Sequence, residues 1–228
     1  MMNDYDIISF DLDDTLWPVK PVIDHAESTL YQWFGKKYPK VTKKYTQEDI
    51  RIFRKPILDE FEDMMHDLTF VRRQVILRMA NSCDYPEDMV DEAMTIYKEA
   101  RNAVTFYDDV LPSLEKLHKI FLLVAVTNGN ADIERIGISQ FFEHVFRSAE
   151  LGIAKPNPGV FIAVADFFQV KPERILHIGD DPVRDIQAAQ YHGMETVWLN
   201  RENQKWPKDM QRPGHIVNNL FEFVDLLM

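Results

Sequence analysis

The sequence is poor in cysteine and shows no targeting segment. Cys83 is the only cysteine, which excludes an internal disulfide and is typical of proteins from a reducing compartment. The first ten residues, MMNDYDIISF, carry acids where a secretory signal peptide needs basic and then apolar residues. We therefore expect a cytoplasmic protein.

Positive charge is also scarce. The 26 lysines and arginines face 37 aspartates and glutamates, so the formal net charge is −11 at pH 7. Such a chain lacks the basic surface that nucleic-acid binding requires, and an anionic ligand would need a metal ion or a local basic group. No apolar run approaches the ~20 residues of a membrane-spanning helix. The sequence predicts a soluble globular protein with neither nucleic-acid nor membrane partners, and it leaves the oligomeric state open.

Short apolar segments alternate with helical patterns along much of the chain. The segments are rich in β-branched or aromatic residues and end in polar or glycine-containing turns, which is typical of strands. These predicted strands are residues 5–10, 120–126, 174–178, 195–199 and 215–217. The predicted helices between them are residues 110–118, 158–168, 182–191 and 218–227. The alternation predicts an α/β fold, a doubly wound, Rossmann-like parallel sheet with helices on both faces.

Residues 19–105 interrupt this alternation. They contain stretches with helical spacing and little strand signal, at residues 24–34, 48–64, 68–80 and 86–104. We expect an inserted helical domain at 19–105 and a core domain made of 1–18 and 106–228. Pro18, Pro21 and the turn YDDVLP would connect the two.

The stretch IISFDLDDTLWP places three carboxylates directly after the first predicted strand. Asp11, Asp13 and Asp14 fall within four positions. Neighbouring anions repel one another and resist leaving water, so such a cluster is unfavourable unless a cation compensates it. Because side chains alternate along a strand, Asp11 and Asp13 can point to the same side if extended geometry persists.

Two further predicted strands end in polar residues. The strand at 120–126 runs into TNGN (127–130), and the strand at 174–178 runs into GDD (179–181), with Asp185 a helical turn later. A fourth loop, AKPNP, contains Lys155. Because the carboxyl ends of parallel strands meet at one edge of the sheet, where ligands bind, we expect these segments to converge.

The chemistry of these residues points to phosphoryl transfer. Asp11, Asp13 and Asp180 would form a hard, oxygen-rich site suited to Mg²⁺. Thr127, the backbone N–H groups after it and Lys155 would supply donors to a phosphate.

The segments DLDDT, TNGN, AKPNP and GDDPVRD resemble, in order and spacing, the four signature motifs of the haloacid dehalogenase (HAD) superfamily. The resemblance extends over roughly residues 1–200, and the helical insert lies where that superfamily has its helical cap. It implies a HAD core with an inserted cap and a Mg²⁺-dependent phosphatase. The partner would be a small-molecule phosphate ester.

The resemblance also implies roles for single residues. Asp11 would be the nucleophile that forms an aspartyl-phosphate, and Asp13 would protonate the leaving alkoxide and later activate water. Asp11, the main-chain carbonyl of Asp13 and Asp180 would bind Mg²⁺. The remaining roles are phosphoryl binding by Thr127, Asn128 and Lys155, and support of the metal through water by Asp181 and Asp185.

Structural alternatives exist for these residues. Each motif alone favours a solvated loop or a cap, and Asp14 and Asp181 fit a turn or a helix cap as well as they fit chemistry. An EF-hand loop over the first cluster fails, because Leu16 stands where glycine is needed and Val22 where glutamate is needed. A Walker-type nucleotide site is excluded, since no GxxxxGK[ST] occurs. His177, inside a predicted strand, is expected to be a core histidine with a satisfied ring.

Three other activities use similar residues. The dehalogenase branch shares the aspartate nucleophile but not the aspartate two residues later, so Asp13 argues against it. A sugar-phosphate phosphatase or phosphomutase keeps both aspartates and stays open. A phosphoacceptor signalling domain also gathers acids, threonine and lysine around Mg²⁺, but it needs no inserted helical domain.

The segments FDLDDTLW, VAVTNGN, ILHIGDD and the tail after GMETVWLNREN are similar to bacterial phosphatases of flavin metabolism. Those act on FMN and on the riboflavin precursor 5-amino-6-(5-phosphoribitylamino)uracil, which implies such a substrate here. Trp17 is expected to offer a flat apolar surface to the ring of this substrate, and the alternative is that it packs within the protein. Thr69, Arg72 and Arg73 are candidates for contacts to ribityl hydroxyls or ring carbonyls, with a solvated helix face as the alternative.

Overall fold

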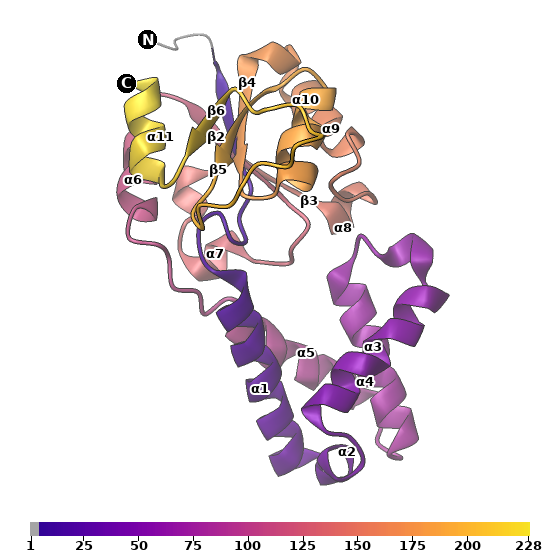
Figure 1. Ribbon diagram of the computed structural model, residues 1–228. Helices are drawn as coiled ribbons and strands as arrows, with labels where there is room; N and C mark the ends of the chain where they lie inside the picture. Colours follow the sequence, from indigo (N-terminus) through magenta and orange to yellow (C-terminus); the bar gives the residue numbers. More distant parts are fainter. Residues whose placement is uncertain (1–4) are drawn as a thin grey trace. The chain divides into compact units, whose positions relative to one another are not determined.

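The computed structural model describes residues 5–228, which fall into two compact units (Figure 1). One unit is the chain up to Pro18 with Thr105–Gly129 and Gly137–Met228, and the other is Val19–Val104 with Asn130–Ile136. Residues 1–4 lie outside the described residues. They are part of the acidic N-terminal stretch whose composition does not fit a signal peptide. Within residues 5–228, no helix has the length and apolar character needed to cross a lipid bilayer.

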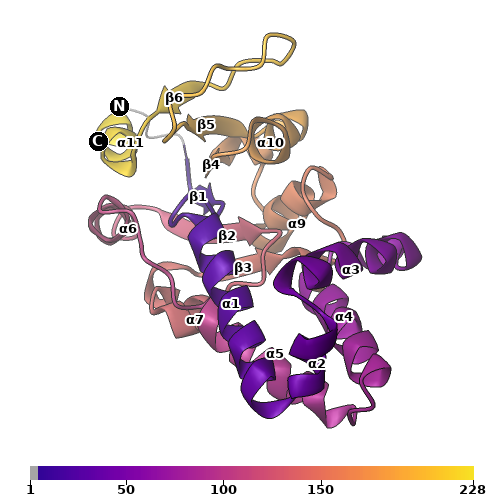
Figure 2. The same cartoon turned by 60° about the horizontal axis from the view of Figure 1, so that its bottom comes forward.

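The first unit contains a six-stranded parallel sheet. Its strands follow one another in the order β3-β2-β1-β4-β5-β6, a succession that can be followed in Figure 2. The strands are β1 (Ile7–Phe10), β2 (Leu122–Thr127), β3 (His144–Arg147), β4 (Ile175–Gly179), β5 (Glu195–Leu199) and β6 (His215–Val217). The direction of winding reverses at β1, so the carboxyl ends of β2, β1 and β4 form the crevice where such sheets bind ligands.

Strand β3 was not predicted. Its sequence, HVFR, is short and has polar residues at both ends, so it shows no alternation and little strand signal. It pairs in parallel with the edge of β2, from Val124 opposite His144 to Thr127 opposite Arg147. A neighbour distant in sequence therefore makes this segment a strand.

Helices cover both faces of the sheet (Figure 1). On one face, α9 (Gly159–Phe168) and α10 (Ala188–Tyr191) bury Phe161 and Ala189 in a cluster with strand residues such as Val124. On the other, α11 (Leu220–Leu227), beside α6 (Val110–Leu117), places the ring of Phe223 edge-on to Phe10. Burial on both faces explains why the strands read as nearly continuous apolar runs. Shorter segments in this unit are η2 (Ser139–Phe141), α8 (Ser148–Leu151), η3 (Pro172–Arg174) and η4 (Pro182–Gln187).

The second unit is helical and has its own apolar core. Its helices are α1 (Val19–Lys37), α2 (Pro39–Lys44), α3 (Gln47–Glu60), η1 (Glu62–Met64), α4 (Leu68–Ser82), α5 (Asp88–Arg101) and α7 (Ile133–Ile136). Thr46 begins α3 with a reciprocal capping box to Asp49, and the Asp67 carboxylate caps α4. The core gathers one apolar face from each long helix, including Phe34, Val71 and Ala93. The predicted α/β sheet with an inserted helical region is confirmed.

The segment Asn130–Ile136 belongs to the helical unit rather than to the core domain expected at 106–228. Asn130 Nδ2 donates to Thr69 Oγ1 at 3.3 Å, and the Asp132 N–H donates to Asn102 Oδ1 at 2.8 Å. We propose the domain boundaries expected above, with this segment reassigned to the helical domain.

Candidate active site

The carboxyl ends of three central strands bring the predicted site residues together. Asp11 follows β1, Thr127 ends β2, and Asp180 follows β4. Phe10 pairs with Ile178 of β4, and the Asp11 N–H then donates to the Ile178 carbonyl at 3.0 Å. This bond carries the β1–β4 pairing one residue past the strand, which fixes where the Asp11 side chain leaves the sheet.

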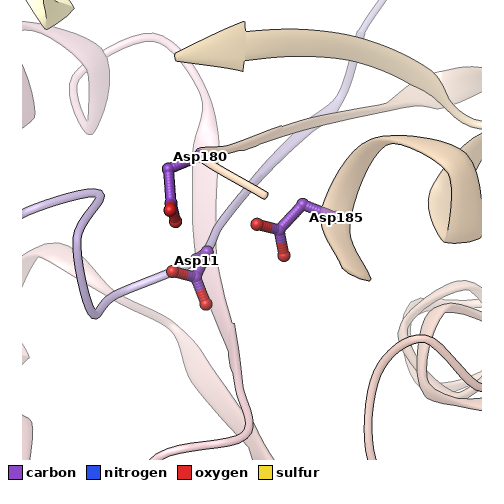
Figure 3. Close-up of side chains that lie close together, drawn as sticks. All are labelled: Asp11, Asp180 and Asp185. Carbon is purple, nitrogen blue, oxygen red and sulfur yellow. The ribbon is translucent and has the colours of Figure 1, made fainter. Parts of the chain in front are cut away.

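Three carboxyl groups, from Asp11, Asp180 and Asp185, point toward one another (Figure 3). One oxygen from each lies within 4.8 Å of the others. The Asp11 and Asp185 side chains are buried, and that of Asp180 is partly exposed. Asp185 therefore takes the place in this cluster that strand alternation gave to the Asp13 side chain.

The ammonium group of Lys155 lies among these carboxylates. Its Nζ donates to Asp11 Oδ1 and to Asp185 Oδ1, at 2.6 Å each, and to the Val126 carbonyl at 2.9 Å. These bonds use all three hydrogens of the ammonium group. With every carboxyl ionised, three carboxylates and one ammonium leave two negative charges uncompensated.

Burial disfavours the charged forms of two of these acids. It raises the pKa of Asp11 to about 7, even though Lys155 opposes the shift. Burial, with the charges of Asp11 and Asp185, raises the pKa of Asp180 to about 8. Burial alone would also raise the pKa of Asp185, but Lys155 and His177 outweigh it and lower that pKa. Lys155 thus pairs with both Asp11 and Asp185, and its single positive charge does not compensate all three carboxylates.

The cluster fits a magnesium ion. Its donors are hard carboxylate oxygens, which Mg²⁺ prefers, and the charge that it lacks is that of one divalent cation. Asp11 and Asp180 are the residues that would hold the ion through their side chains, and the pair of Asp185 with Lys155 would border it.

We expect the gain in stability on adding Mg²⁺ to the protein to grow as pH rises from about 5 to about 8. The pKa values of Asp11 and Asp180 are raised, so the folded state holds protons that the unfolded chain releases near its ordinary pKa of 3.8. Stability without metal therefore falls as pH rises through about 7 and 8, and Mg²⁺ replaces those protons. Thermal melts with Mg²⁺ or EDTA measure the effect. Asp180→Asn should remove most of the Mg²⁺ response, and an equal Mg²⁺ shift at both ends of the pH range would contradict the assignment.

The approach of Asp185 to β4 depends on a glycine. A Cβ at Gly179 would lie 2.4 Å from the Asp185 carboxyl group, so only glycine leaves room for it. Asp185 Oδ2 also accepts the Asp181 N–H at 3.0 Å. The Asp181 carboxylate caps η4 by accepting the N–H groups of Val183 and Arg184, both at 2.8 Å. Of the two readings of Asp181, the structure supports the helix cap.

Asn128 holds the backbone of Lys155. Its Nδ2 donates to the Lys155 carbonyl and its Oδ1 accepts the Lys155 N–H, both at 2.8 Å. Its contact with a phosphoryl group stays a prediction. Thr127 Oγ1 accepts the Gly129 N–H at 2.9 Å, so its own hydrogen can be donated to a ligand.

The Asp13 side chain lies outside the cluster, and a tight turn follows it at residues 14–16. Asp14 has a φ of +62°, in the left-handed region that aspartate tolerates, and its N–H donates to the Trp17 carbonyl at 2.8 Å. Extended geometry therefore ends here, and Asp14 is a turn residue. Trp17 has no exposed surface and packs edge-on against Phe106. The expectation that its ring offers an open surface to substrate is wrong, and the packing alternative holds.

Two predicted specificity residues on α4 have partners within the helical unit. Thr69 Oγ1 accepts from Asn130, as described above. Arg73 Nη1 lies 2.7 Å from Asp91 Oδ1, in a pair whose side chains are both largely exposed. For Arg73 this favours the solvated helix face.

Arg72 has a more buried setting and a neighbour that sequence reasoning missed. Its guanidinium lies 3.7 Å from the centre of the Tyr97 ring, and its Nη2 is 3.6 Å from Glu27 Oε1. Arg54, on α3, has a buried Nε with no hydrogen-bond partner within residues 5–228. Burial and then the charge of Arg72 lower the pKa of Arg54. No local pattern distinguishes Arg54 from the other arginines, because only helix packing brings it near Arg72.

Other supporting residues were also missed. Trp198 Nε1 donates to the Asp180 carbonyl at 2.7 Å, and Thr15 Oγ1 donates to Asp180 Oδ1 at 3.3 Å. His177 is fully buried as expected, and its Nδ1 lies 3.0 Å from Ser9 Oγ. Its ring is only half satisfied, because Nε2, 3.6 Å from Asp185 Oδ1, has no hydrogen-bond partner within residues 5–228. A polar Ser9 within an apolar strand was the one local signal of this contact.

The fold and this acidic site define a class of enzyme. The family model of haloacid dehalogenase-like hydrolases matches residues 5–193, and the chain belongs to this family. The predicted superfamily is thereby confirmed, as is the prediction that the protein is an enzyme, a hydrolase.

Relatives with known names span most of the chain. It is 30% identical over 200 residues to the 5-amino-6-(5-phospho-D-ribitylamino)uracil phosphatase YigB of Escherichia coli K12, covering 86% of this chain and 84% of that one. It is 31% identical over 201 residues to the glyceraldehyde 3-phosphate phosphatase of Methanopyrus kandleri, covering 85% and 83%. The crystal structure of a 2-haloacid dehalogenase from Pseudomonas syringae pv. tomato DC3000 has a TM-score of 0.92, with 32% identity and 98% of each chain covered.

Proposed function

We propose that this protein is a Mg²⁺-dependent phosphomonoester hydrolase that forms an aspartyl-phosphate on Asp11. The observation that carries the proposal is the Lys155 ammonium bound between Asp11 and Asp185, beside Asp180. Lys155 shields the negative charge of Asp11. A carboxylate needs this shielding in order to approach an anionic phosphoryl group. Mg²⁺, when bound, supplies the positive charge that the cluster still lacks.

Two proton-coupled displacements complete the proposed reaction. An Asp11 oxygen attacks phosphorus, the ester P–O bond breaks, and Asp13 gives its proton to the leaving alkoxide. Asp13, now a carboxylate, takes a proton from water while the water oxygen attacks the aspartyl-phosphate. This step releases inorganic phosphate and restores Asp11.

Other residues bind and position in this proposal. The Thr127 hydroxyl binds a phosphoryl oxygen, and the Lys155 ammonium binds another by exchanging one of its three present acceptors for it. Asn128 keeps Lys155 in place through its backbone. The Asp13 carbonyl is the proposed third protein ligand of the ion. Asp185 supports the site by holding Lys155.

The test is Mg²⁺-dependent release of inorganic phosphate from p-nitrophenyl phosphate and from an alkyl phosphate. EDTA should abolish turnover and added Mg²⁺ should restore it, because the carboxylates would otherwise repel the substrate. The similarity to a named 2-haloacid dehalogenase makes halide release from a 2-haloacid the matched control. Halide release without phosphate release would reject the proposal, as would full phosphatase activity in EDTA.

For the substrate, we propose FMN or 5-amino-6-(5-phosphoribitylamino)uracil, which would place the enzyme in riboflavin biosynthesis or flavin metabolism. The similarity to the E. coli phosphatase supports this choice. The similarity to a glyceraldehyde 3-phosphate phosphatase, at nearly equal identity and coverage, favours a small sugar phosphate as the second candidate.

We expect kcat/KM for a ribityl phosphate to exceed that for glyceraldehyde 3-phosphate, glucose 6-phosphate or phosphoglycolate by about tenfold or more. Arg54, whose Nε has no hydrogen-bond partner in the described part of the chain, and Arg72 are the proposed donors to the ring carbonyls of the substrate. Arg54→Gln should therefore lower kcat/KM for the ribityl substrate and spare p-nitrophenyl phosphate. Arg73→Gln is the matched control, since Arg73 pairs with an exposed Asp91. A preference for a small sugar phosphate would reject the flavin assignment and leave the phosphatase proposal intact.

A further inference from the structure

The indole of Trp17 forms a hydrogen bond with the Asp13 carboxylate. Trp17 Nε1 donates to Asp13 Oδ1 at 2.8 Å. The two residues also form an isolated backbone bridge, and the Leu16 N–H donates to the Leu12 carbonyl at 2.8 Å. The indole donor and its acceptor therefore lie at the two ends of one tight turn.

This donor is held rigidly. Trp17 is 0% exposed, and its ring packs edge-on against Phe106 with centroids 5.9 Å apart. A large buried ring has few alternative rotamers, so its N–H keeps one direction. The indole N–H therefore keeps the same Asp13 oxygen as its acceptor.

The chemistry of the two groups makes the two Asp13 oxygens unequal. An indole N–H is a donor only, so Oδ1 must act as an acceptor. A carboxyl group that protonates a leaving alkoxide needs its proton on a defined oxygen with a defined direction.

We propose that Trp17 is a positioning residue for proton transfer, which fixes the orientation of the Asp13 carboxyl group by donating to its Oδ1. The inference rests on the proposed function, in which Asp13 is the general acid and base. It replaces the role in substrate stacking that the sequence suggested for Trp17.

Trp17→Phe tests this inference, because it removes the N–H and keeps an aromatic ring. The phosphorylation step should slow by roughly tenfold to a hundredfold for an alkyl phosphate and by less than about threefold for p-nitrophenyl phosphate, whose leaving group needs little protonation. Asp13→Asn should show the same pattern with larger losses. Trp33→Phe, in the helical unit, is the matched control and should leave both rates unchanged. Equal losses on the two substrates with Trp17→Phe would reject the inference.

A double-mutant cycle shows whether Trp17 acts through Asp13. In an Asp13→Asn background no proton transfer remains, so Trp17→Phe should no longer change the difference between the two substrates. Losses that add independently would overturn the inference. If Asp13→Asn itself shows no dependence on the leaving group, the proposed function of Asp13 fails rather than the role of Trp17.

The contact can also be measured without turnover and without replacing the tryptophan. The chain has four tryptophans, so a ¹⁵N-tryptophan spectrum should contain four indole N–H signals. Asp13→Asn replaces a charged acceptor by a neutral amide, which should shift one indole signal upfield and leave the others in place. No shift would overturn the inference, including in the case that Trp17→Phe fails to fold.

Discussion

Asp11→Asn is expected to lower phosphatase turnover by about 10³-fold or more, because an amide cannot replace the carboxylate that attacks phosphorus. The substitution keeps the shape of a side chain whose pKa burial raises to about 7. Lys155 retains its contacts with Asp185 and with the Val126 carbonyl. Phosphate release under Mg²⁺ saturation measures the loss.

The fold of this variant should survive. The change from carboxylate to amide removes a buried negative charge, so the metal-free protein at about pH 8 should be at least as stable as the wild type. Asp14→Asn is the matched control, since asparagine also tolerates the positive φ of that turn. Near wild-type turnover in Asp11→Asn would exclude an aspartyl-phosphate on that residue.

Lys155→Met is expected to have the largest effect on stability. It leaves Asp11 and Asp185 buried without the ammonium that both contact at 2.6 Å. Breaking a buried pair by removing one partner costs about 3–5 kcal/mol, which corresponds to roughly 6–20 °C in Tm for a chain of this size. Turnover should fall as well, since Lys155 is the proposed phosphoryl ligand. Thermal melts with and without Mg²⁺ measure the stability change.

The loss should depend on pH and on metal in a defined direction. At about pH 5 Asp11 can take up a proton, since its pKa is raised to about 7, so the penalty should be smaller there than at about pH 8. Mg²⁺ should also reduce the penalty by supplying positive charge. Lys171→Met, another lysine that precedes a proline but is exposed, is the control and should change little. A Lys155→Met variant as stable as the wild type in EDTA at about pH 8 would show that the ion pair has no structural role.

The sheet and the region of the site were predictable because they depend on local patterns. Buried parallel strands are short apolar runs, so β1, β2, β4 and β5 stand out from the polar turns that follow them. The carboxyl ends of parallel strands lie at one edge of the sheet, where ligands bind, so the residues after β1, β2 and β4 could be expected to be neighbours. Strand β3 was missed because its pairing with β2, and not its own four residues, makes it a strand.

The finer geometry of the site was not predictable from spacing. Strand alternation placed the Asp13 side chain with Asp11, but the left-handed backbone of Asp14 folds the chain back so that Trp17 donates to the Asp13 carboxylate. Asp185 lies closer to Asp11 than expected, since Gly179 has no side chain to keep it away. Each difference arises from a backbone turn or a close approach that no residue pattern encodes by itself.

The sequence alone determined the fold class, the helical insertion and the set of residues at the strand ends, because hydrophobic periodicity and the order of the motifs are local properties of the chain. Only the tertiary structure decided which of those residues contact one another. In that structure Lys155 pairs with both Asp11 and Asp185, the Asn128 side chain forms hydrogen bonds with the Lys155 backbone, and Trp17 packs against Phe106. These contacts join segments that fold against one another across the sheet or around a turn. Their partners are chosen by burial, by charge compensation and by the need of each buried polar group for a hydrogen bond.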